Sequence, residues 1–180
     1  MKTSEVSKFY YFFPQTVAVI GVDTNVMPAA WHTPISAQPP LYGVLVSPKR
    51  YTYSLLNRKH GFTVNFLEHS KAPLIARIGS TSGRDTEKLK ECNIKAAPAD
   101  RVSGVILLDS YAAYECEKFA MHEYGDHFLV VGKIVLIYYN EGIINHQGIV
   151  NENIVSPMLY FGKDRYITID PDTLAVHKRE

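Results

Sequence analysis

Short apolar runs rich in valine, isoleucine and aromatic residues recur along the first part of the chain. Three of them lie at 16–23, 41–47 and 62–68. β-Branched and aromatic residues in runs of this length are typical of β-strands, because their side chains pack well on a pleated surface. We therefore predict a strand in each run.

The second half of the chain is dominated by one long β-rich segment, 104–140. Apolar and polar residues alternate over 112–124, which predicts a strand with one covered face. The run 127–140 is more continuously apolar, as expected for a strand covered on both faces. The sequence YGD at 124–126 predicts the turn of a long hairpin between them. Two shorter strands are predicted at 157–162 and 165–170.

Helical patterns are fewer and shorter. We predict helices over 51–60, with Thr52 as the N-cap and Gly61 as the terminator, and over 71–79. A third is predicted over 82–93, because Asp and Glu come early and Lys late, which suits the helix dipole. Many strands with a few short helices predict a mainly β fold, a closed or partly closed antiparallel barrel. The length suits a single domain over residues 1–180.

One stretch does not follow this pattern. Residues 26–41, VMPAAWHTPISAQPPL, hold the only tryptophan of the chain and four of its ten prolines. Proline is avoided in a regular core strand. We therefore predict an irregular backbone there, whose free N–H and C=O groups can contact a ligand.

Composition narrows the possible functions. Hydrophobic residues make up 46% of the chain, charged residues 21%, and the formal net charge is +1. This charge balance argues against nucleic-acid binding. No run approaches the roughly 20 apolar residues of a membrane helix, and the N-terminus does not read as a signal peptide. We expect a cytoplasmic protein with two packed, reduced cysteines, no metal site and no membrane association.

Hydroxyl and cationic residues recur in two further stretches. SPKRYTYSLL places Arg50 and Thr52 at the start of a predicted helix, and GSTSGRDTEK leads with glycine and hydroxyl residues into another. Hydroxyl groups, Arg and Lys at a helix N-terminus favour a phosphate group. Taken alone, the second stretch is also compatible with an ordinary capped surface helix. Their combination with the aromatic stretch 26–41 favours a ligand with both a phosphate and a flat ring.

Five motifs occur in an order that resembles a known family. NVMPAAWHTPIS, PPLYGVLVSPKRYTYSLL, FTVNF, GSTSGRDTEKLKE and GDHFLVVGKI are similar to the flavin reductase-like, FMN-binding split-barrel proteins across roughly residues 15–165. The resemblance implies a six-stranded Greek-key split β-barrel and a homodimer that holds FMN at or near its interface.

The resemblance also implies a set of site residues. The isoalloxazine ring of FMN would lie against the backbone and side chains of the first stretch, and the amide of Asn65 would reach ribityl or ring oxygens. The phosphate would fall to a subset of the basic and hydroxyl residues. The predicted cofactor-binding residues are Met27, Ala29, Ala30, Trp31, His32, Thr33, Ser36, Arg50, Thr52, Asn65, Ser80, Ser82, Gly83, Arg84 and Lys88.

The histidine of the GDH motif is the catalytic candidate. In related flavin reductases this residue lies near the nicotinamide site, so His127 is expected to contact NADH, NADPH or the reduced ring, or simply to pair with Asp126. The expected function is an oxidoreductase that reduces flavin with NAD(P)H. A flavoredoxin-type electron carrier with a protein redox partner, and a flavin-binding module without turnover, are the alternatives.

Overall fold

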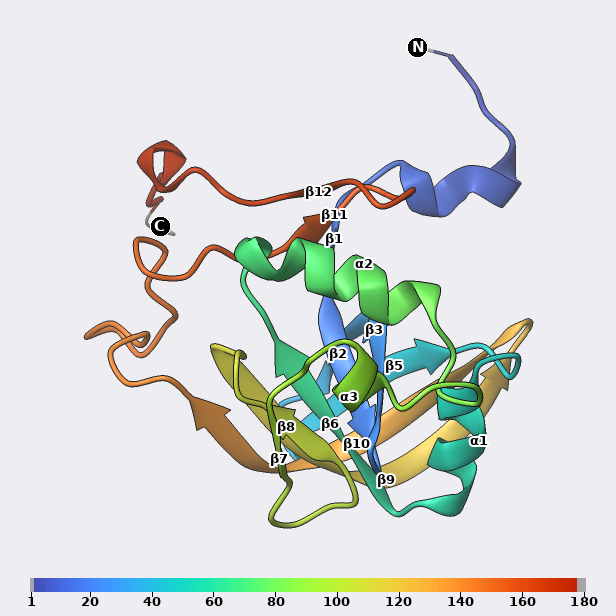
Figure 1. Cartoon of the computed structure of the whole chain (residues 1–180). Coiled ribbons are helices and arrows are strands. Elements are labelled where there is room, and N and C mark those ends of the chain that lie inside the picture. Colours follow the sequence, from blue (N-terminus) through green and yellow to red (C-terminus); the bar gives the residue numbers. More distant parts are fainter. Residues whose placement is uncertain (1, 178–180) are drawn as a thin grey trace.

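The computed structural model describes residues 2–177, and its centre is one strongly curled antiparallel sheet (Figure 1). The sheet has seven strands in the order β3-β2-β6-β9-β10-β5-β4. Their bounds are β2 Ala18–Val22, β3 Asn25–Ala29, β4 His32–Ser36, β5 Leu41–Val46, β6 Gly61–Phe66, β9 Ala112–Tyr124 and β10 His127–Tyr139. The mainly β, split-barrel fold class is confirmed, with seven strands in the main sheet instead of six.

The two edges of this sheet are joined by only two residues. Strand β3 ends at Ala29 and strand β4 begins at His32, although they occupy opposite ends of the strand order. Only a sheet that curls back on itself can bring its two edges together in this way. Ala30 and Trp31 therefore mark the seam of the half-barrel.

The prediction of an irregular backbone over 26–41 is wrong for most of its length, although a turn spans 37–40. Both β3 and β4 are strands, and they contain Pro28 and Pro34. Proline lacks an N–H donor, so it is excluded from strands paired on both sides but tolerated on an edge. The edge position resolves the conflict, because each of these strands has one partner in the sheet.

The long hairpin is confirmed. Strands β9 and β10 pair over their whole length, with two register irregularities, and Gly125 takes a positive φ of 63° in the turn. Two small sheets accompany the main one. They consist of β1 Gln15–Thr16 with β11 Leu159–Tyr160 and β12 Tyr166–Ile167, and of β7 Ala96–Pro98 with β8 Val105–Leu107.

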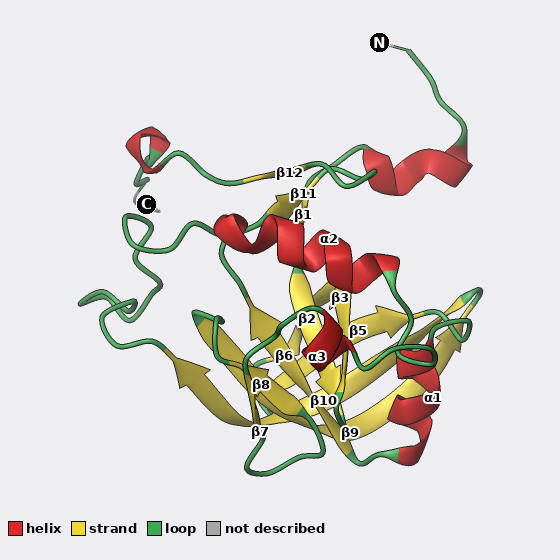
Figure 2. Cartoon of the chain, in the orientation of Figure 1, coloured by secondary structure: helices red, strands yellow, loops and turns green. Residues whose placement is uncertain are grey.

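Short helices pack around the sheet (Figure 2). They are α1 Tyr51–Arg58, α2 Ala72–Ser80 and α3 Lys88–Glu91, and short 3₁₀ helices are η1 Val6–Tyr11, η2 His69–Lys71 and η3 Pro171–Thr173. Helix α2 lies between the main sheet and the β1-β11-β12 sheet (Figure 1). It buries Ile75 and Ile78 in a second hydrophobic core that also contains Val19 and Val26.

Two details of the helix predictions are wrong. The segment 82–93 is mostly not helical: a turn closes on the carbonyl of Ser82, and only Lys88–Glu91 forms a helix. Thr52 is not an N-cap, since that position belongs to Arg50, and Gly61 is the first residue of β6.

Both cysteines, Cys92 and Cys116, are buried and free as expected. No helix within residues 2–177 is long and apolar enough to cross a membrane.

Candidate functional site

A cationic cleft of about 530 Å³ lies between β3, the start of α1 and the end of α2. We call it the basic cleft. Its lining combines four cationic side chains, one carboxylate and several hydroxyl groups, contributed by Lys49, Arg50, Arg84, Lys88, Asp85, Thr52, Thr81 and Ser82. This set of donors carries a positive net charge and therefore matches a phosphate group.

The first turn of α1 adds to this charge. Helix α1 begins at Tyr51, and its N-cap residue, Arg50, makes no side-chain capping hydrogen bond. The first N–H groups of an α-helix have no partner within the helix, and the helix dipole gives this end a partial positive charge. An uncapped helix start beside Arg50 is therefore suited to an anion.

Lys88 ties two walls of the basic cleft together. Its Nζ donates to the carbonyl of Val26 on β3 at 3.1 Å and to the carbonyl of Ile78 near the end of α2 at 2.9 Å. The side chain is 6% exposed, and burial, with the nearby Arg50 guanidinium, lowers its pKa. Lys88 thus has a structural role in addition to any contact with a ligand.

Asn25 links β3 to α1 beneath the same cleft. Its Nδ2 donates to the Thr52 hydroxyl oxygen at 2.9 Å, and both side chains are buried. Because Thr52 accepts this bond, its own hydroxyl hydrogen stays available to an acceptor in the basic cleft.

A second cleft, of about 520 Å³, continues from the basic cleft toward the seam of the barrel. We call it the central cleft. The two clefts share Met27, Pro28, Lys49 and Arg50. The other lining residues are Ala29, Ala30, Trp31, Leu45, Val46, Ser47 and His127.

The outer edge of β3 forms one side of the central cleft. The carbonyl of Val26 points away from β2, since it accepts from Lys88. Strand alternation places Pro28 on the same outward side, where its missing N–H costs nothing. The small side chains of Ala29 and Ala30 leave room for a planar ring to approach the backbone.

Two aromatic rings form the far wall of the central cleft. Trp31 and His127 have centroids 4.8 Å apart, and Phe9 and Tyr10 of η1 also pack against Trp31. His127 Nδ1 pairs with Asp126 Oδ1 at 2.8 Å. This hydrogen bond lowers the pKa of Asp126 and occupies Nδ1 of the imidazole, so that Nε2 is the ring atom left for a ligand.

Most of the predicted site residues are brought together by these two clefts. They are Met27, Ala29, Ala30, Trp31, Arg50, Thr52, Ser82, Gly83, Arg84, Lys88 and His127. Ser80 lines an adjoining cleft of about 320 Å³ that also contains Arg50. His32 and Thr33 line an apolar cleft on the other side of Trp31, and Ser36, at the end of β4, lines none of the clefts named here.

Asn65 lies apart from all of them. It is fully buried in β6, where Nδ2 donates to the carbonyl of Val19 at 3.1 Å and Oδ1 accepts from the N–H of Leu107 at 2.9 Å. An amide inside a strand does need partners, as its sequence position indicated, but the protein itself provides them. The structure thus gives Asn65 no access to a ligand in either cleft.

Sequence reasoning missed Lys49, Pro28 and Asn25. Lys49 directly precedes Arg50, so the same cationic signal could have included it. Asn25 carries no local signal, because its role depends on the pairing of β3 with β2 and on the position of α1.

His32 lies in a hydrogen-bonded network at the seam. Its Nε2 lies 3.1 Å from the carbonyl of Thr16 and its Nδ1 lies 2.6 Å from the Tyr42 hydroxyl. A carbonyl can only accept, so the neutral ring donates from Nε2 and accepts at Nδ1. Burial lowers the pKa of His32.

This network predicts a pH dependence of stability. The unfolded chain takes up the His32 proton near the ordinary pKa of about 6.5, before the folded chain does. The contribution of His32 to the free energy of unfolding is therefore complete above this pH and is lost as the pH falls below it. Urea unfolding measures the free energy of unfolding at pH 7.5 and at pH 5. The decrease between the two pH values should be smaller in His32→Gln than in the wild type. An identical loss in both proteins would show that folding does not lower the pKa of His32.

Comparison with known proteins identifies a domain family and several similar structures. Residues 10–169 match the flavin reductase like domain. An FMN-binding protein from Thermus thermophilus, solved with bound 1-cyclohex-2-enone, is 34% identical and superposes with a TM-score of 0.85 over 98% of each chain. Flavoredoxin of Desulfovibrio vulgaris (Miyazaki F) has a TM-score of 0.86 at 21% identity, over 98% of this chain and 97% of its own. An uncharacterised protein of Pyrococcus abyssi is 35% identical over 67% of this chain and 69% of its own.

Proposed function

Since the chain belongs to the flavin reductase like domain family, we propose that it binds FMN and acts as an NAD(P)H-dependent flavin oxidoreductase. The observation that carries this proposal is the continuity of the two clefts. A cationic cleft at a helix N-terminus leads directly into a cleft that runs along the outer edge of β3. The cationic cleft matches the phosphate of FMN, and the adjoining cleft along β3 matches its ring.

The residues of the basic cleft would hold the phosphate. Arg50 and Arg84 supply charge-assisted donors, and Thr52 and Ser82 supply hydroxyl groups. Met27 to Trp31 would hold the ring, with backbone groups toward its polar edge and the Trp31 side chain at its end. When bound, the flavin supplies the two-electron redox chemistry, and the protein positions it and excludes water.

His127 would orient the hydride donor. Asp126 pairs with Nδ1 of the imidazole, which leaves Nε2 to hydrogen-bond a carboxamide or a ring atom in the central cleft. This role needs no proton transfer. A donor held in a reactive orientation gains rate through positioning alone.

The test is anaerobic reduction of the FMN-loaded protein by NADH and by NADPH. We expect bleaching by at least one of them, and a reduction rate on the order of 10- to 100-fold lower in His127→Ala with FMN affinity nearly unchanged. His122→Ala, an exposed histidine on the same hairpin, is the matched control. A lower melting temperature with an unchanged rate per folded molecule would make His127 a fold residue. Reduction by dithionite and by neither nicotinamide would instead favour the electron-carrier alternative.

We further propose that the protein is a homodimer. The hairpin β9–β10 exposes several large apolar side chains, with Phe119 62%, Ile137 52% and Tyr139 60% exposed. The central cleft is also open to solvent, and a second copy packed over it would enclose it. Sedimentation at micromolar concentration is expected to give a dimer. A monomer that still holds FMN would refute this prediction.

A further inference from the structure

Two buried side chains that line the basic cleft have hydrogen-bonding atoms that the protein does not use. Thr52 on α1 is 2% exposed and Asn25 on β3 is 7% exposed. Asn25 Nδ2 donates to Thr52 Oγ1 at 2.9 Å, but no residue within 2–177 accepts the Thr52 hydroxyl hydrogen. Asn25 Oδ1 likewise has no hydrogen-bond partner in this part of the chain. Buried polar groups are normally paired, so these unused atoms need an explanation.

The direction of the bond between these two side chains follows from their chemistry. An amide nitrogen can only donate, so the Thr52 oxygen must accept with one of its lone pairs. The hydroxyl hydrogen then points away from Asn25. Thr52 lies in the first turn of α1, beside Arg50. Its hydroxyl hydrogen therefore joins the free backbone N–H groups of this turn as a donor toward the basic cleft.

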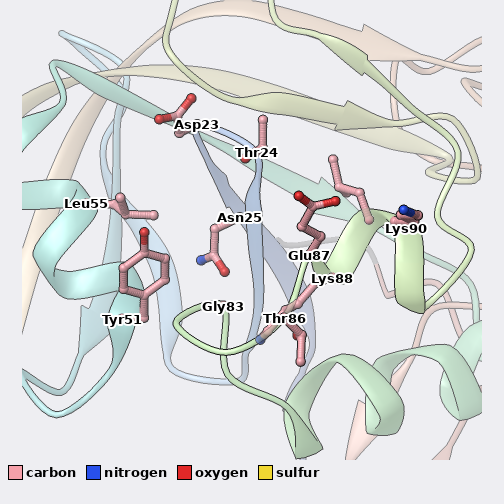
Figure 3. A pocket seen from close by; sticks show the side chains of 11 residues that line it. Asp23, Thr24, Asn25, Tyr51, Leu55, Gly83, Thr86, Glu87, Lys88 and Lys90 are labelled. Carbon is pink, nitrogen blue, oxygen red and sulfur yellow. The ribbon is translucent and has the colours of Figure 1, made fainter.

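Gly83 explains why the amide of Asn25 keeps this orientation. Rotation of the amide by 180° would exchange Oδ1 and Nδ2 and would turn Thr52 into the donor of the pair. Gly83 lies against the Oδ1 end, since a Cβ there would collide with Oδ1 and lie 2.9 Å from the Tyr51 ring. Figure 3 shows the Asn25 side chain beside Tyr51 and close to the turn that contains Gly83. A glycine Cα hydrogen attracts an oxygen and repels an N–H hydrogen, so the observed orientation is favoured.

We propose that Asn25 is a positioning residue that gives the basic cleft its preference for phosphorylated ligands. It acts through Thr52, whose oxygen it holds through Nδ2, so that the hydroxyl donates to a phosphate oxygen. Its Oδ1 contacts Gly83, in the turn that carries Ser82 and Arg84. A donor whose direction is already fixed loses less conformational entropy when the ligand binds. The identity of this ligand as FMN rests on the proposed function.

A double-mutant cycle tests this role, because leucine and valine copy the shapes of the two side chains without their polar atoms. The measured quantity is the affinity for FMN divided by the affinity for riboflavin, from flavin-fluorescence titration. Thr52→Val should lower this ratio about tenfold, and Asn25→Leu about threefold to tenfold. Asn25→Leu in the Thr52→Val background should lower it no further, since the hydroxyl that Asn25 directs is gone. Asn57→Leu, at an exposed position of α1, is the matched control.

Asn25→Asp reverses the hydrogen bond with almost no change of shape. A carboxylate only accepts, so the Thr52 hydroxyl would donate to it and would no longer reach the ligand. The ratio of FMN to riboflavin affinity should fall further than in Asn25→Leu. Relative to the wild type at the same pH, this loss should shrink as the pH falls and the introduced carboxylate takes up a proton. A pH-independent loss would contradict the proposed direction of the bond.

The outcomes separate this inference from the proposed function. An effect of Asn25→Leu that is equal for FMN and riboflavin, or that persists undiminished in the Thr52→Val background, would overturn the role of Asn25. Inorganic phosphate is the probe that needs no flavin. Its titration by amide NMR should give saturable shifts at residues 49–52 and 81–88, with weaker binding in Asn25→Leu, and equal binding in both proteins would also overturn the inference. Failure of the wild type to bind FMN would overturn the proposed function, while the phosphate titration would still decide the role of Asn25.

Discussion

Arg50→Ala is expected to weaken FMN binding about tenfold to a hundredfold and to leave riboflavin binding nearly unchanged. Arg50 lines both the basic and the central cleft, next to the first turn of α1. A hydrogen bond between charged groups contributes roughly 1.5–3 kcal/mol, which corresponds to this range of affinities. Riboflavin lacks the phosphate, so it should not lose this contact. Titration by flavin fluorescence measures both ligands.

Two further variants sharpen this test. Arg84→Ala should behave like Arg50→Ala, because its exposed guanidinium lines the same cleft and makes only a 3.5 Å contact to the carbonyl of Lys49. Arg58→Ala removes an equal charge at the far end of α1 and should leave FMN affinity unchanged. Lys88→Ala is a poorer probe, because it also releases the carbonyls of Val26 and Ile78. If Arg50→Ala lost equal affinity for FMN and for riboflavin, the assignment of the phosphate to the basic cleft would be refuted.

Glu115→Leu is expected to lower the free energy of unfolding by about 3–5 kcal/mol. The Glu115 side chain on β9 is fully buried. Its carboxylate accepts from the N–H groups of Asp100 at 2.8 Å, Arg101 at 2.6 Å and Val102 at 3.1 Å, and from the Tyr138 hydroxyl at 2.6 Å. Leucine would leave the N–H groups of residues 100–102 without this acceptor and would place an apolar side chain among them, which is the costly case. The Tyr138 hydroxyl would keep Asp100 Oδ2 as an acceptor at 2.9 Å.

Urea unfolding measures this effect, and the same strand offers its control. Glu117→Leu replaces an exposed glutamate two residues along β9 and should change stability by less than about 0.5 kcal/mol. Tyr138→Phe removes one donor to Glu115 and should cost about 1 kcal/mol. Similar losses in Glu115→Leu and Glu117→Leu would show that the carboxylate does not hold the 100–102 loop.

The local sequence by itself determined most of the secondary structure. Strands rich in valine, isoleucine and aromatic residues, such as 41–47 and 62–68, formed where their composition predicted them, since side-chain packing on a pleated surface depends on a few neighbouring residues. The same is true of the hairpin at Gly125, where glycine permits the positive φ of the turn. The cationic and hydroxyl residues of the basic cleft were also visible as sequence motifs, and the order of the motifs predicted the fold family.

Only the tertiary structure decided where these residues meet and how exceptions to local rules are accommodated. The prolines of 26–36 are compatible with strands because curling of the sheet leaves β3 and β4 as edges. The charge order of 82–93 favours a helix by tenths of a kcal/mol, whereas the turn at Ser82 lets Lys88 bury its ammonium group between β3 and α2. Asn65 bonds within the core, and Asn25 reaches Thr52, 27 residues away along the chain. These contacts join distant segments, and local patterns carry no information about long-range pairing.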